Sequence, residues 1–343
     1  MDSLKQPAPL VLVSSSPHLH CGSSVSGAMR DVLLALIPTT LAALWYFRLD
    51  ALIVIFSCTL SAIFFEALCQ KMMGRPVTIK DGSALLTGLL LAFCLPASLP
   101  PILAVFGGFC AIVIGKQVFG GLGYNIFNPA HIGRAILLAS FPQQMTAWLP
   151  PVTALADAAT SATGKVDAVT TATPLVLLRI AEHSWQTGGT AYLPELWQMF
   201  IGNTGGSLGE TCAPALLVGG LFLLWRGHID WRIPVYYLGT VAVLTGSYGY
   251  LHNYDSLFAL YHLCAGGLLI GAFFMATDWV TSPITKRGRI IYALGLGLLT
   301  TLIRLRGGYV EGVCYSILMM NMVTPLIDRY VRTLPFGGGV RHD

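Results

Sequence analysis

Residues 51–68 read ALIVIFSCTLSAIFFEAL, an apolar run in which Glu66 is the only charged side chain. The run is close to the roughly 20 residues that an α-helix needs to cross a bilayer. Strands of a membrane barrel would instead show segments of about 10 residues with alternating apolar and polar side chains. The run therefore predicts a transmembrane helix and argues against a barrel.

The composition extends this prediction to the whole chain. Of the 343 residues, 55% are hydrophobic and 10% are charged, whereas about 25% of the residues of a soluble domain are charged. The mean hydropathy is +0.68. The net charge is +4, and the basic residues are dispersed among loops, where they determine the topology of a membrane protein. They form no basic cluster of the kind that binds nucleic acid. We expect an all-α, polytopic membrane protein that contacts lipid and binds no nucleic acid.

Apolar segments recur along the chain, and we predict about ten transmembrane helices from them. The third and fifth segments are short for a full crossing. Short segments interrupted by Gly or Pro are typical of discontinuous helices that line a protected site. The ten segments are 32–47, 51–69, 84–95, 102–118, 132–141, 213–225, 235–251, 257–276, 290–303 and 313–327.

These segments divide the chain into five parts. Residues 9–13 form too short an apolar core for a cleavable signal peptide, so we expect the N-terminus to be cytoplasmic. The cytoplasmic side then receives 15 of the 20 Lys and Arg residues, all except Arg48, Lys165, Arg179, Arg304 and Arg306. This excess follows the positive-inside rule. The predicted parts are a cytoplasmic N-terminal tail (1–30), a first transmembrane half (31–141), an outer, periplasmic segment (142–212), a second transmembrane half (213–327) and a cytoplasmic C-terminal tail (328–343).

The two halves have features of an inverted repeat. Five spans per half, an odd number, would put the halves in opposite orientations, as in many transporters. GLGYNIFNPA (121–130) precedes the fifth span, while GGYVEG (307–312) and NMVTP (321–325) mark the tenth. Such Gly and Asn-Pro patterns also recur by chance in membrane helices, so both interpretations stay open.

The outer segment contains DAVTTATPL at residues 167–175. Threonine-rich stretches are common in exposed loops, where their hydroxyls form turns with the backbone. The stretch also suits modification, because Thr173 lies between small or rigid neighbours and Asp167 could bind a Mg²⁺ ion that guides a pyrophosphate. It resembles the D-x-x-[ST]-x-A-T signature at which a flavin transferase esterifies FMN phosphate to the last threonine. The resemblance implies covalent FMN at Thr173 and a recognition motif that includes Asp167, Thr170 and Ala172.

The ten spans, the G-x-N-x-F-N-P-A string (123–130) and the flavin signature together resemble the D-type membrane subunit of the Rnf (Rsx) electron-transport complex. The sister family is the B-type membrane subunit of the Na⁺-translocating NADH:quinone oxidoreductase, which usually has a longer N-terminal extension and S-G-A-T at the flavin site. This chain has a tail of 30 residues and T-T-A-T. Both departures favour the Rnf side.

The resemblance implies a protein that is not catalytic alone and lies in the inner membrane of a bacterium. Its complex would couple electron flow between reduced ferredoxin and NAD⁺ to Na⁺ or H⁺ movement. Implied partners are a second FMN-carrying subunit, iron–sulfur subunits and a flavin transferase, and a second, non-covalent riboflavin is implied within the helices. Such a transferase works outside the cytoplasm, which agrees with the periplasmic position predicted for Thr173.

Three polar residues in apolar surroundings are further candidates. Pro129 frees backbone carbonyls upstream, so Asn125 and Asn128 could contact Na⁺ or a flavin ring, but Asn-Pro is also a common helix start. A charge in the hydrocarbon layer costs about 2.5–3.5 kcal/mol. Glu66 is therefore a candidate for an ion path or for a buried pair.

The eight cysteines have no C-x-x-C spacing, which favours small buried hydrophobes over a metal site. A cluster shared with another protein of the complex would involve Cys110 or Cys264. The chain has no phosphate loop and no dinucleotide fingerprint, and we predict no catalytic residue and no metal site within it. Two rival interpretations are an inverted-repeat channel or carrier for a small solute, and a structural anchor for electron-carrying partners.

Overall fold

The computed structural model describes residues 24–152, 172–186, 189, 193–255, 257–309 and 311–332. Over these ranges the regular structure is helical, apart from one isolated bridge between Pro96 and Ser207. The first helices are α1 (Val25–Ala35), α2 (Ile37–Met72), η1 (Ile79–Asp81), α3 (Ser83–Phe93), α4 (Pro101–Phe109), the π-helical η2 (Cys110–Gln117) and α5 (Pro129–Ser140). The short α6 (Pro142–Met145), α8 (Pro174–Gln186) and α9 (Leu196–Ile201) follow. The last are α10 (Ala213–Arg226), α11 (Arg232–Leu251), α12 (Phe258–Cys264), α13 (Leu268–Ile270), the π-helical η3 (Gly271–Met275), α14 (Lys286–Arg306) and α15 (Val313–Tyr330).

The structure confirms an all-helical protein of membrane character. Two helical stretches in the described residues, Val25–Met72 and Lys286–Arg306, are long and apolar enough to cross a bilayer, and a bent pair of helices could form a third. Large apolar side chains face outward, with Trp45, Trp225 and Tyr250 being 72%, 80% and 83% exposed. Ten separate crossings remain a prediction.

Breaks in the helices differ in part from those predicted. The predicted segment 32–47 begins in α1 and continues into α2, and the segment 51–69 lies in the same α2, which is interrupted at Arg48 by a positive φ of 49°. Helices α3 and α5 are indeed short, with 11 and 12 residues, or about 17 Å of rise against the roughly 30 Å of a hydrocarbon core. A break that was not predicted bends the chain by 66° between α12 and α13.

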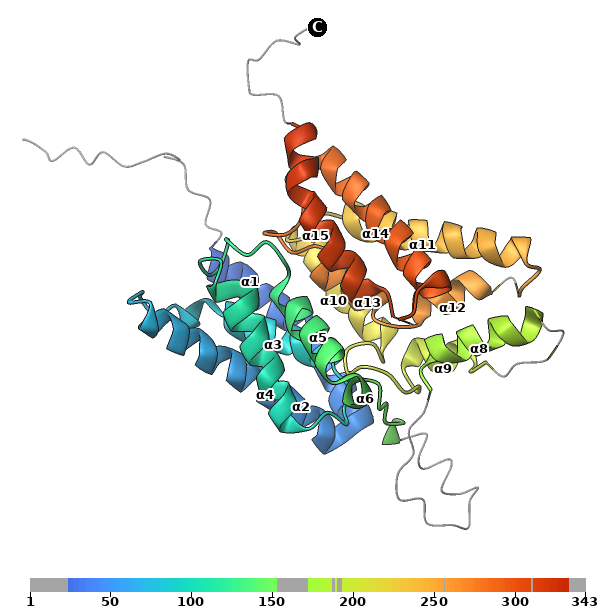
Figure 1. The fold of residues 1–343 in the computed structure, drawn as a ribbon, viewed down its shortest axis with the longest axis horizontal. Helices are drawn as coiled ribbons and strands as arrows, with labels where there is room; N and C mark the ends of the chain where they lie inside the picture. The colour runs from blue at the N-terminus through green and yellow to red at the C-terminus, as the bar shows by residue number, and fades with distance from the viewer. Residues whose placement is uncertain are drawn as a thin grey trace, which may run out of the picture.

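The helices form two groups that meet along one interface. Figure 1 shows α1–α5 gathered on one side and α10–α15 on the other. Within the first group α2 packs on α3 and α4, and within the second α11 packs on α12 and α14. The groups meet where α1 and α2 contact α10 and where α5 contacts α15. A smaller apolar cluster joins α8 and α9 to α12.

The end of the predicted outer segment enters the core. The backbone N–H groups of Leu208 and Gly209 donate to the carbonyls of Leu95 and Phe93 at 3.1 and 2.9 Å. Phe93 is the last residue of α3 and Leu95 lies just beyond it. Carbonyls at the end of a helix have no N–H partner within the helix, and here the incoming segment supplies one. A Cβ on Gly209 would lie 2.4 Å from Cβ of Phe93, so glycine permits the approach. The contact fixes the position of the next residue, Glu210.

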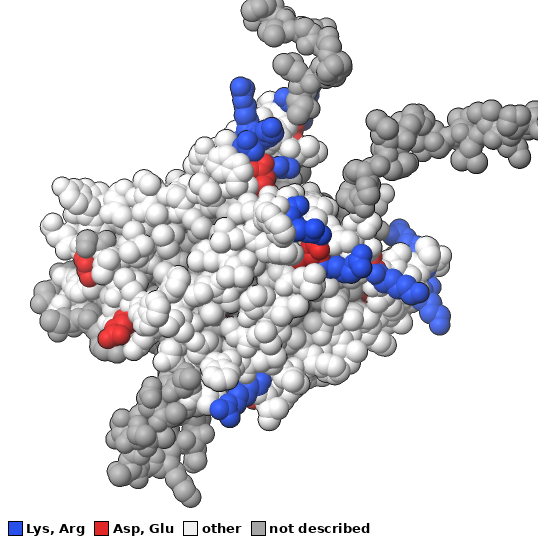
Figure 2. All heavy atoms as spheres, turned by 180° about the vertical axis from the view of Figure 1, so that it is seen from behind, with Lys and Arg blue, Asp and Glu red and all other residues white. Residues whose placement is uncertain are grey.

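Most of the basic side chains visible in Figure 2 collect at one end of the molecule, and a smaller basic group lies apart from them at the bottom of the view. Contacts join the loops at this end: Arg226 pairs with Asp31 at 2.8 Å and Arg289 with Asp230 at 2.7 Å. Burial raises the pKa of Asp230, but hydrogen bonds from Arg232 and Arg289 outweigh it and hold the pKa below its usual range. These loops are among those predicted to be cytoplasmic.

The interface between α1 and α10 gives a test of the fold. A Cβ on Gly219 of α10 would lie 2.2 Å from the backbone oxygen of Ala35. We expect Gly219→Ala to lower the free energy of unfolding by about 1–3 kcal/mol through overpacking, measured by denaturation in detergent.

Gly239→Ala on α11 is the matched control, because its Cβ would have no neighbour within 4 Å. This variant should be as stable as the original protein, or slightly more stable, since alanine is the better helix former. Equal stability of the two variants would contradict the close crossing.

Candidate functional sites

Thr173 forms the N-cap of α8. Its carbonyl accepts from the N–H of Leu177 at 3.0 Å, and its Oγ1 accepts a long bond of 3.4 Å from the N–H of Val176. Pro174 occupies the first helical position, where it is well tolerated. The N-terminus of a helix favours anions through its free N–H groups and its dipole. The buried Thr173 hydroxyl thus lies where a phosphoester would be stabilised.

A cavity of about 420 Å³ adjoins Thr173. Its walls come from both helix groups and from the segment between them. Two aromatic side chains offer flat surfaces, and three ionisable side chains offer charge. The lining residues are Arg134, Leu138, Met145, Thr146, Trp148, Ala172, Thr173, Leu175, Val176, Glu210, Gly308, Tyr309 and Glu311.

The charged residues of this cavity bridge the two groups. Arg134 of α5 donates through Nη2 to Oε2 of Glu311, which precedes α15. The Arg134 Nε and the Glu311 Oε1 find no hydrogen-bond partner within the part of the chain that the structure describes. Arg134 is buried, although the topology prediction counted it on the cytoplasmic side.

Glu210 is the third ionisable residue of the cavity, and its Oε2 accepts from the Ser207 hydroxyl at 2.7 Å. Burial raises the pKa of Glu210 to about 7, and the charge of Glu311 adds to the rise, while Ser207 and Arg134 oppose it. The cavity beside Thr173 therefore holds a buried carboxyl whose pKa is raised.

Among the other residues of the predicted flavin motif, Ala172 is exposed and lines the cavity. Asp167 and Thr170 lie outside the described residues.

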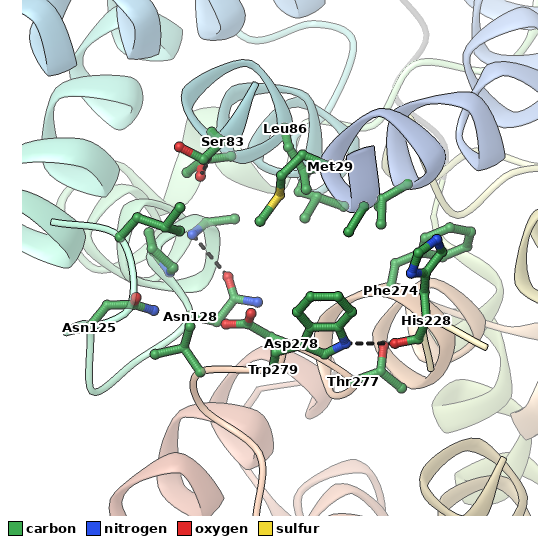
Figure 3. Close-up of a pocket in the computed structure, with 18 of the residues that line it drawn as sticks. Met29, Ser83, Leu86, Asn125, Asn128, His228, Phe274, Thr277, Asp278 and Trp279 are labelled. Atoms are coloured by element: carbon green, nitrogen blue, oxygen red, sulfur yellow. Dashed lines mark hydrogen bonds between the residues drawn. The ribbon is translucent and has the colours of Figure 1, made fainter. Parts of the chain in front are cut away.

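A second cavity, of about 350 Å³, lies toward the basic end of the molecule. Figure 3 shows Met29 and Leu86 on one side of it, and Asn125, Asn128 and Asp278 on the other. Trp279 is held at its edge by a bond of 2.6 Å from Nε1 to the carbonyl of His228. The remaining lining residues include Val32, Ser83, Thr87, Leu90, Lys116, Pro129, Ala130, Phe273, Phe274 and Thr277.

Both predicted asparagines line this second cavity. Asn128 is the N-cap of α5, with its Oδ1 accepting from the N–H of Ala130 at 3.0 Å, and its Nδ2 donates to the Met275 carbonyl at 3.3 Å. Asn125 is buried, and its Nδ2 donates to the carbonyl of Phe127 at 3.1 Å. The capping role of Asn128 is confirmed, and it ties α5 to η3.

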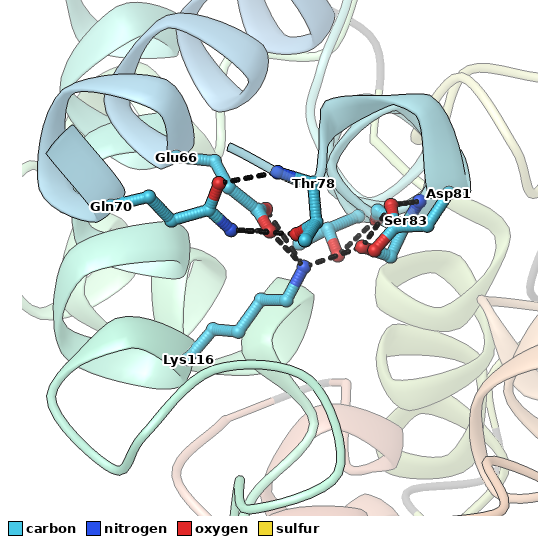
Figure 4. A network of polar contacts seen from close by, with 7 residues as sticks. Glu66, Gln70, Thr78, Asp81, Ser83 and Lys116 are labelled. Carbon is cyan, nitrogen blue, oxygen red and sulfur yellow. Dashed lines mark hydrogen bonds and ion pairs between the residues drawn. The ribbon is translucent and has the colours of Figure 1, made fainter. Parts of the chain in front are cut away.

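Glu66 forms a buried ion pair, one of its two predicted roles. The Lys116 Nζ lies 2.8 and 2.7 Å from the two carboxylate oxygens, and both side chains are 1% exposed. Figure 4 shows the Lys116 ammonium between Glu66 and Ser83, with Gln70 on the other side of the carboxylate. Lys116 was predicted on the cytoplasmic side and not as a partner, although its position near the end of the apolar segment 102–118 could have indicated burial.

The cysteines give no metal site in the described part of the chain, where no three metal-ligating side chains come together. Cys110 is buried and Cys264 is partly buried, and both are free thiols. A cluster shared with another protein of the complex remains a prediction.

The family model of the NQR2, RnfD, RnfE family matches residues 12–337. The chain belongs to this family. It is 50% identical to the D-type subunit of the proton-translocating ferredoxin:NAD(+) oxidoreductase complex of Clostridium ljungdahlii, over 95% of this chain and 96% of that protein. It is 44% identical to the Na(+)-translocating counterpart of Acetobacterium woodii, over 95% of each chain. It is 39% identical to the D-type subunit of the ion-translocating oxidoreductase complex of Escherichia coli strain SE11, over 95% of this chain and 98% of that protein.

Glu210 gives a pH-dependent test of the Thr173 cavity. A raised pKa means that the folded protein favours the protonated carboxyl, so stability falls as the pH rises from about 4.5 to about 7. We expect Glu210→Gln to remove this fall, measured as the midpoint of thermal unfolding of flavin-free protein at a series of pH values.

Glu195→Gln, which changes an exposed carboxyl before α9, is the control and should keep the pH profile of the original protein. If Glu210→Gln also kept that profile, the carboxyl would not titrate in this range.

Proposed function

We propose that this chain is the D-type membrane subunit of an Rnf-type oxidoreductase complex in a bacterial inner membrane. In that role it passes electrons between ferredoxin-linked and NAD-linked partner subunits while the complex moves H⁺ or Na⁺. D-type relatives match over nearly the whole chain, one of them proton-translocating and one Na⁺-translocating. The flavin part of the proposal is carried by one observation: Thr173 caps α8 and opens into a cavity.

Covalent FMN at Thr173 fits the residues around it. The phosphoester would lie at the N-terminus of a helix of 13 residues, which favours negative charge. Trp148 and Tyr309 line the cavity and could stack on a flavin ring, and Arg134 offers an unpartnered Nε. When bound, FMN would supply reversible electron transfer. Asp167, Thr170 and Ala172 would serve as the transferase's recognition motif.

The second cavity suits a non-covalent riboflavin. Its volume of about 350 Å³ falls in the range of roughly 300–1,000 Å³ that is usual for small-molecule sites. Apolar walls such as Leu86 and Phe273, with a few polar groups such as Asn125 and Asn128, match the usual make-up of such sites. Because riboflavin carries no phosphate, its site does not require a helix N-terminus that binds an anion.

Ten spans in an inverted 5+5 repeat are part of the proposal, with cytoplasmic tails at 1–30 and 328–343 and a periplasmic Thr173. Two observations support it. Like elements of the two halves meet at the interface, α1 against α10 and α5 against α15. The loops rich in Lys and Arg are joined at one end by ion pairs.

The proposed partners are the other membrane and peripheral subunits, including a second FMN-carrying subunit and iron–sulfur subunits, together with a flavin transferase. Exposed apolar helix faces with Trp45, Phe56 and Trp225 could contact either lipid or neighbouring membrane subunits.

The covalent bond gives the first test of this function. Thr173→Ala should abolish flavin fluorescence of the denatured protein, because no hydroxyl remains to be esterified. The measurement is in-gel ultraviolet fluorescence after co-production with a flavin transferase, followed by mass spectrometry for an FMN-minus-water increment on the peptide.

Thr171→Ala is the control, since it removes the neighbouring hydroxyl only, and it should retain fluorescence. Fluorescence retained in Thr173→Ala would refute the attachment site. An unmodified peptide from transferase-competent cells would instead favour the rival solute carrier.

The second flavin is tested by filling its cavity. Thr87 of α3 lines the cavity, so Thr87→Trp should expel the non-covalent flavin by occupying its space. The measurement is the flavin released on denaturing the purified complex, and the covalent flavin should be unaffected.

Leu85→Trp on the same helix is the matched control, because Leu85 is 38% exposed and does not line the cavity. Equal flavin release from both variants would argue against riboflavin in this cavity.

A further inference from the structure

Lys116 and Ser83 both line the proposed riboflavin cavity and belong to a buried polar network, and Lys116 carries the positive charge of that network. The Lys116 ammonium is bonded to both oxygens of Glu66 and to the hydroxyl of Ser83, at 2.8, 2.7 and 2.7 Å. All three ammonium hydrogens therefore have acceptors. A buried ion pair of this kind often stabilises a fold no better than apolar residues of similar volume.

The network continues from Glu66 to the surface through a single side chain. The Nε2 of Gln70 donates to Glu66 at 3.2 Å and to the Thr78 hydroxyl at 2.9 Å, while the N–H of Thr78 donates back to Gln70 at 2.9 Å. Gln70 is buried and Thr78 is exposed, at the basic end of the molecule. Gln70 is thus the one side chain that this chain of hydrogen bonds places between the exposed Thr78 and the carboxylate.

The local backbone suits a lysine that changes partner. Lys116 belongs to the π-helical η2, where the N–H of Val118 bonds the carbonyl of Val113, five residues back, at 3.0 Å. Such widened turns are frequent at functional sites. Lysine has a compact charge on a flexible four-carbon stem, which suits an ammonium that exchanges one acceptor for another.

Other ionisable groups face this pair from the neighbouring elements. Asp81 accepts from the Ser83 hydroxyl at 2.8 Å and borders the network on the η1 side. Asp278 lines the same cavity as Lys116. Cys69, one helical turn from Glu66 on α2, is partly buried. Lys116 is the one lysine or arginine among the described residues that line the cavity.

We propose that Lys116 is a charge-compensating switch between the cavity and Glu66. Glu66 and Ser83 hold it while the flavin in the cavity is neutral, and it turns to the flavin when reduction brings negative charge. Glu66 then takes up one cation, H⁺ or Na⁺, past Gln70, because an unpaired buried carboxylate is strongly unfavourable.

The charges balance in this step. One electron arrives at the flavin from a partner electron carrier, one cation arrives at Glu66, and Lys116 keeps its proton. Reversal on reoxidation returns Lys116 to Glu66 and releases the cation. The switch rests on the proposed riboflavin in this cavity and adds to it a link between reduction and cation uptake.

The test uses the purified complete complex. The reduction equilibrium of the cavity flavin is followed by flavin absorbance. The spectrum of the Thr87→Trp complex, which should lack this flavin, is subtracted from that of the original complex. It is measured over a range of pH at fixed Na⁺, and over a range of Na⁺ at fixed pH. If one cation is taken up per electron, the equilibrium constant for flavin reduction should change up to tenfold for each tenfold change in the concentration of that cation. Comparing the pH series with the Na⁺ series identifies the cation.

The informative variant removes both charges at once, as Glu66→Gln with Lys116→Met. Neither member of the ion pair is left without its partner and volume is nearly conserved, so the complex should assemble with near-original thermal stability. The double variant should still contain the cavity flavin, but the reduction equilibrium of this flavin should no longer depend on the cation concentration. Lys80→Met, at an exposed neighbouring lysine, should keep the dependence.

Ser83→Ala serves as a second variant that keeps both charges. Losing one hydrogen bond to Lys116 should shift the equilibrium about fivefold toward the reduced flavin, with the cation dependence intact. The switch is overturned if Ser83→Ala leaves the equilibrium unshifted, or if the double variant keeps the cation dependence. Neither outcome contradicts the riboflavin proposal. If the original complex releases no non-covalent flavin, the proposed riboflavin fails and the switch with it.

Discussion

A charge inside an apolar helix bundle needs a partner within the protein, because neither lipid nor bulk water is available to solvate it. This requirement organises the interior of the molecule. Arg134 on α5 pairs with Glu311 before α15, across the interface of the two helix groups. Lys116 on η2 pairs with Glu66 on α2 inside the first group. Each pair borders one cavity, so the residues that satisfy buried charge also give each cavity its electrostatic character.

The two cavities share the short helix α5. Asn128 caps its start and lines the cavity toward the basic end, whereas Arg134 lines the cavity at Thr173. Ala130 and Arg134 are separated by four residues, or about 6 Å of helical rise. Flavins in both cavities would therefore contact the same helix about one turn apart. The end of the predicted outer segment enters the core at Leu208 and brings Glu210 to the Thr173 cavity.

Local sequence patterns predicted much of the fold. Each predicted apolar segment lies mostly in helix, because a run of apolar residues at membrane length has few alternatives to a helix that satisfies its own backbone. Asn128-Pro129 predicted a helix start, and the structure has one there. The interruption predicted at 48–50 is a break inside α2 at Arg48. The bend between α12 and α13 was not predicted, although Gly266-Gly267 lies there and Gly266 has a φ of 73°, because glycine inside an apolar run does not by itself end a helix.

The sequence by itself determined that the protein is helical and belongs in a membrane, and which threonine is the candidate for FMN, because composition, run length and a short motif are local properties. Only the tertiary structure decided the partners of the buried charges. Glu66 and Lys116 are 50 residues apart, and Arg134 and Glu311 are 177 apart. No local pattern records such a pairing, since it depends on how helices distant in the chain cross and on which face each turns inward.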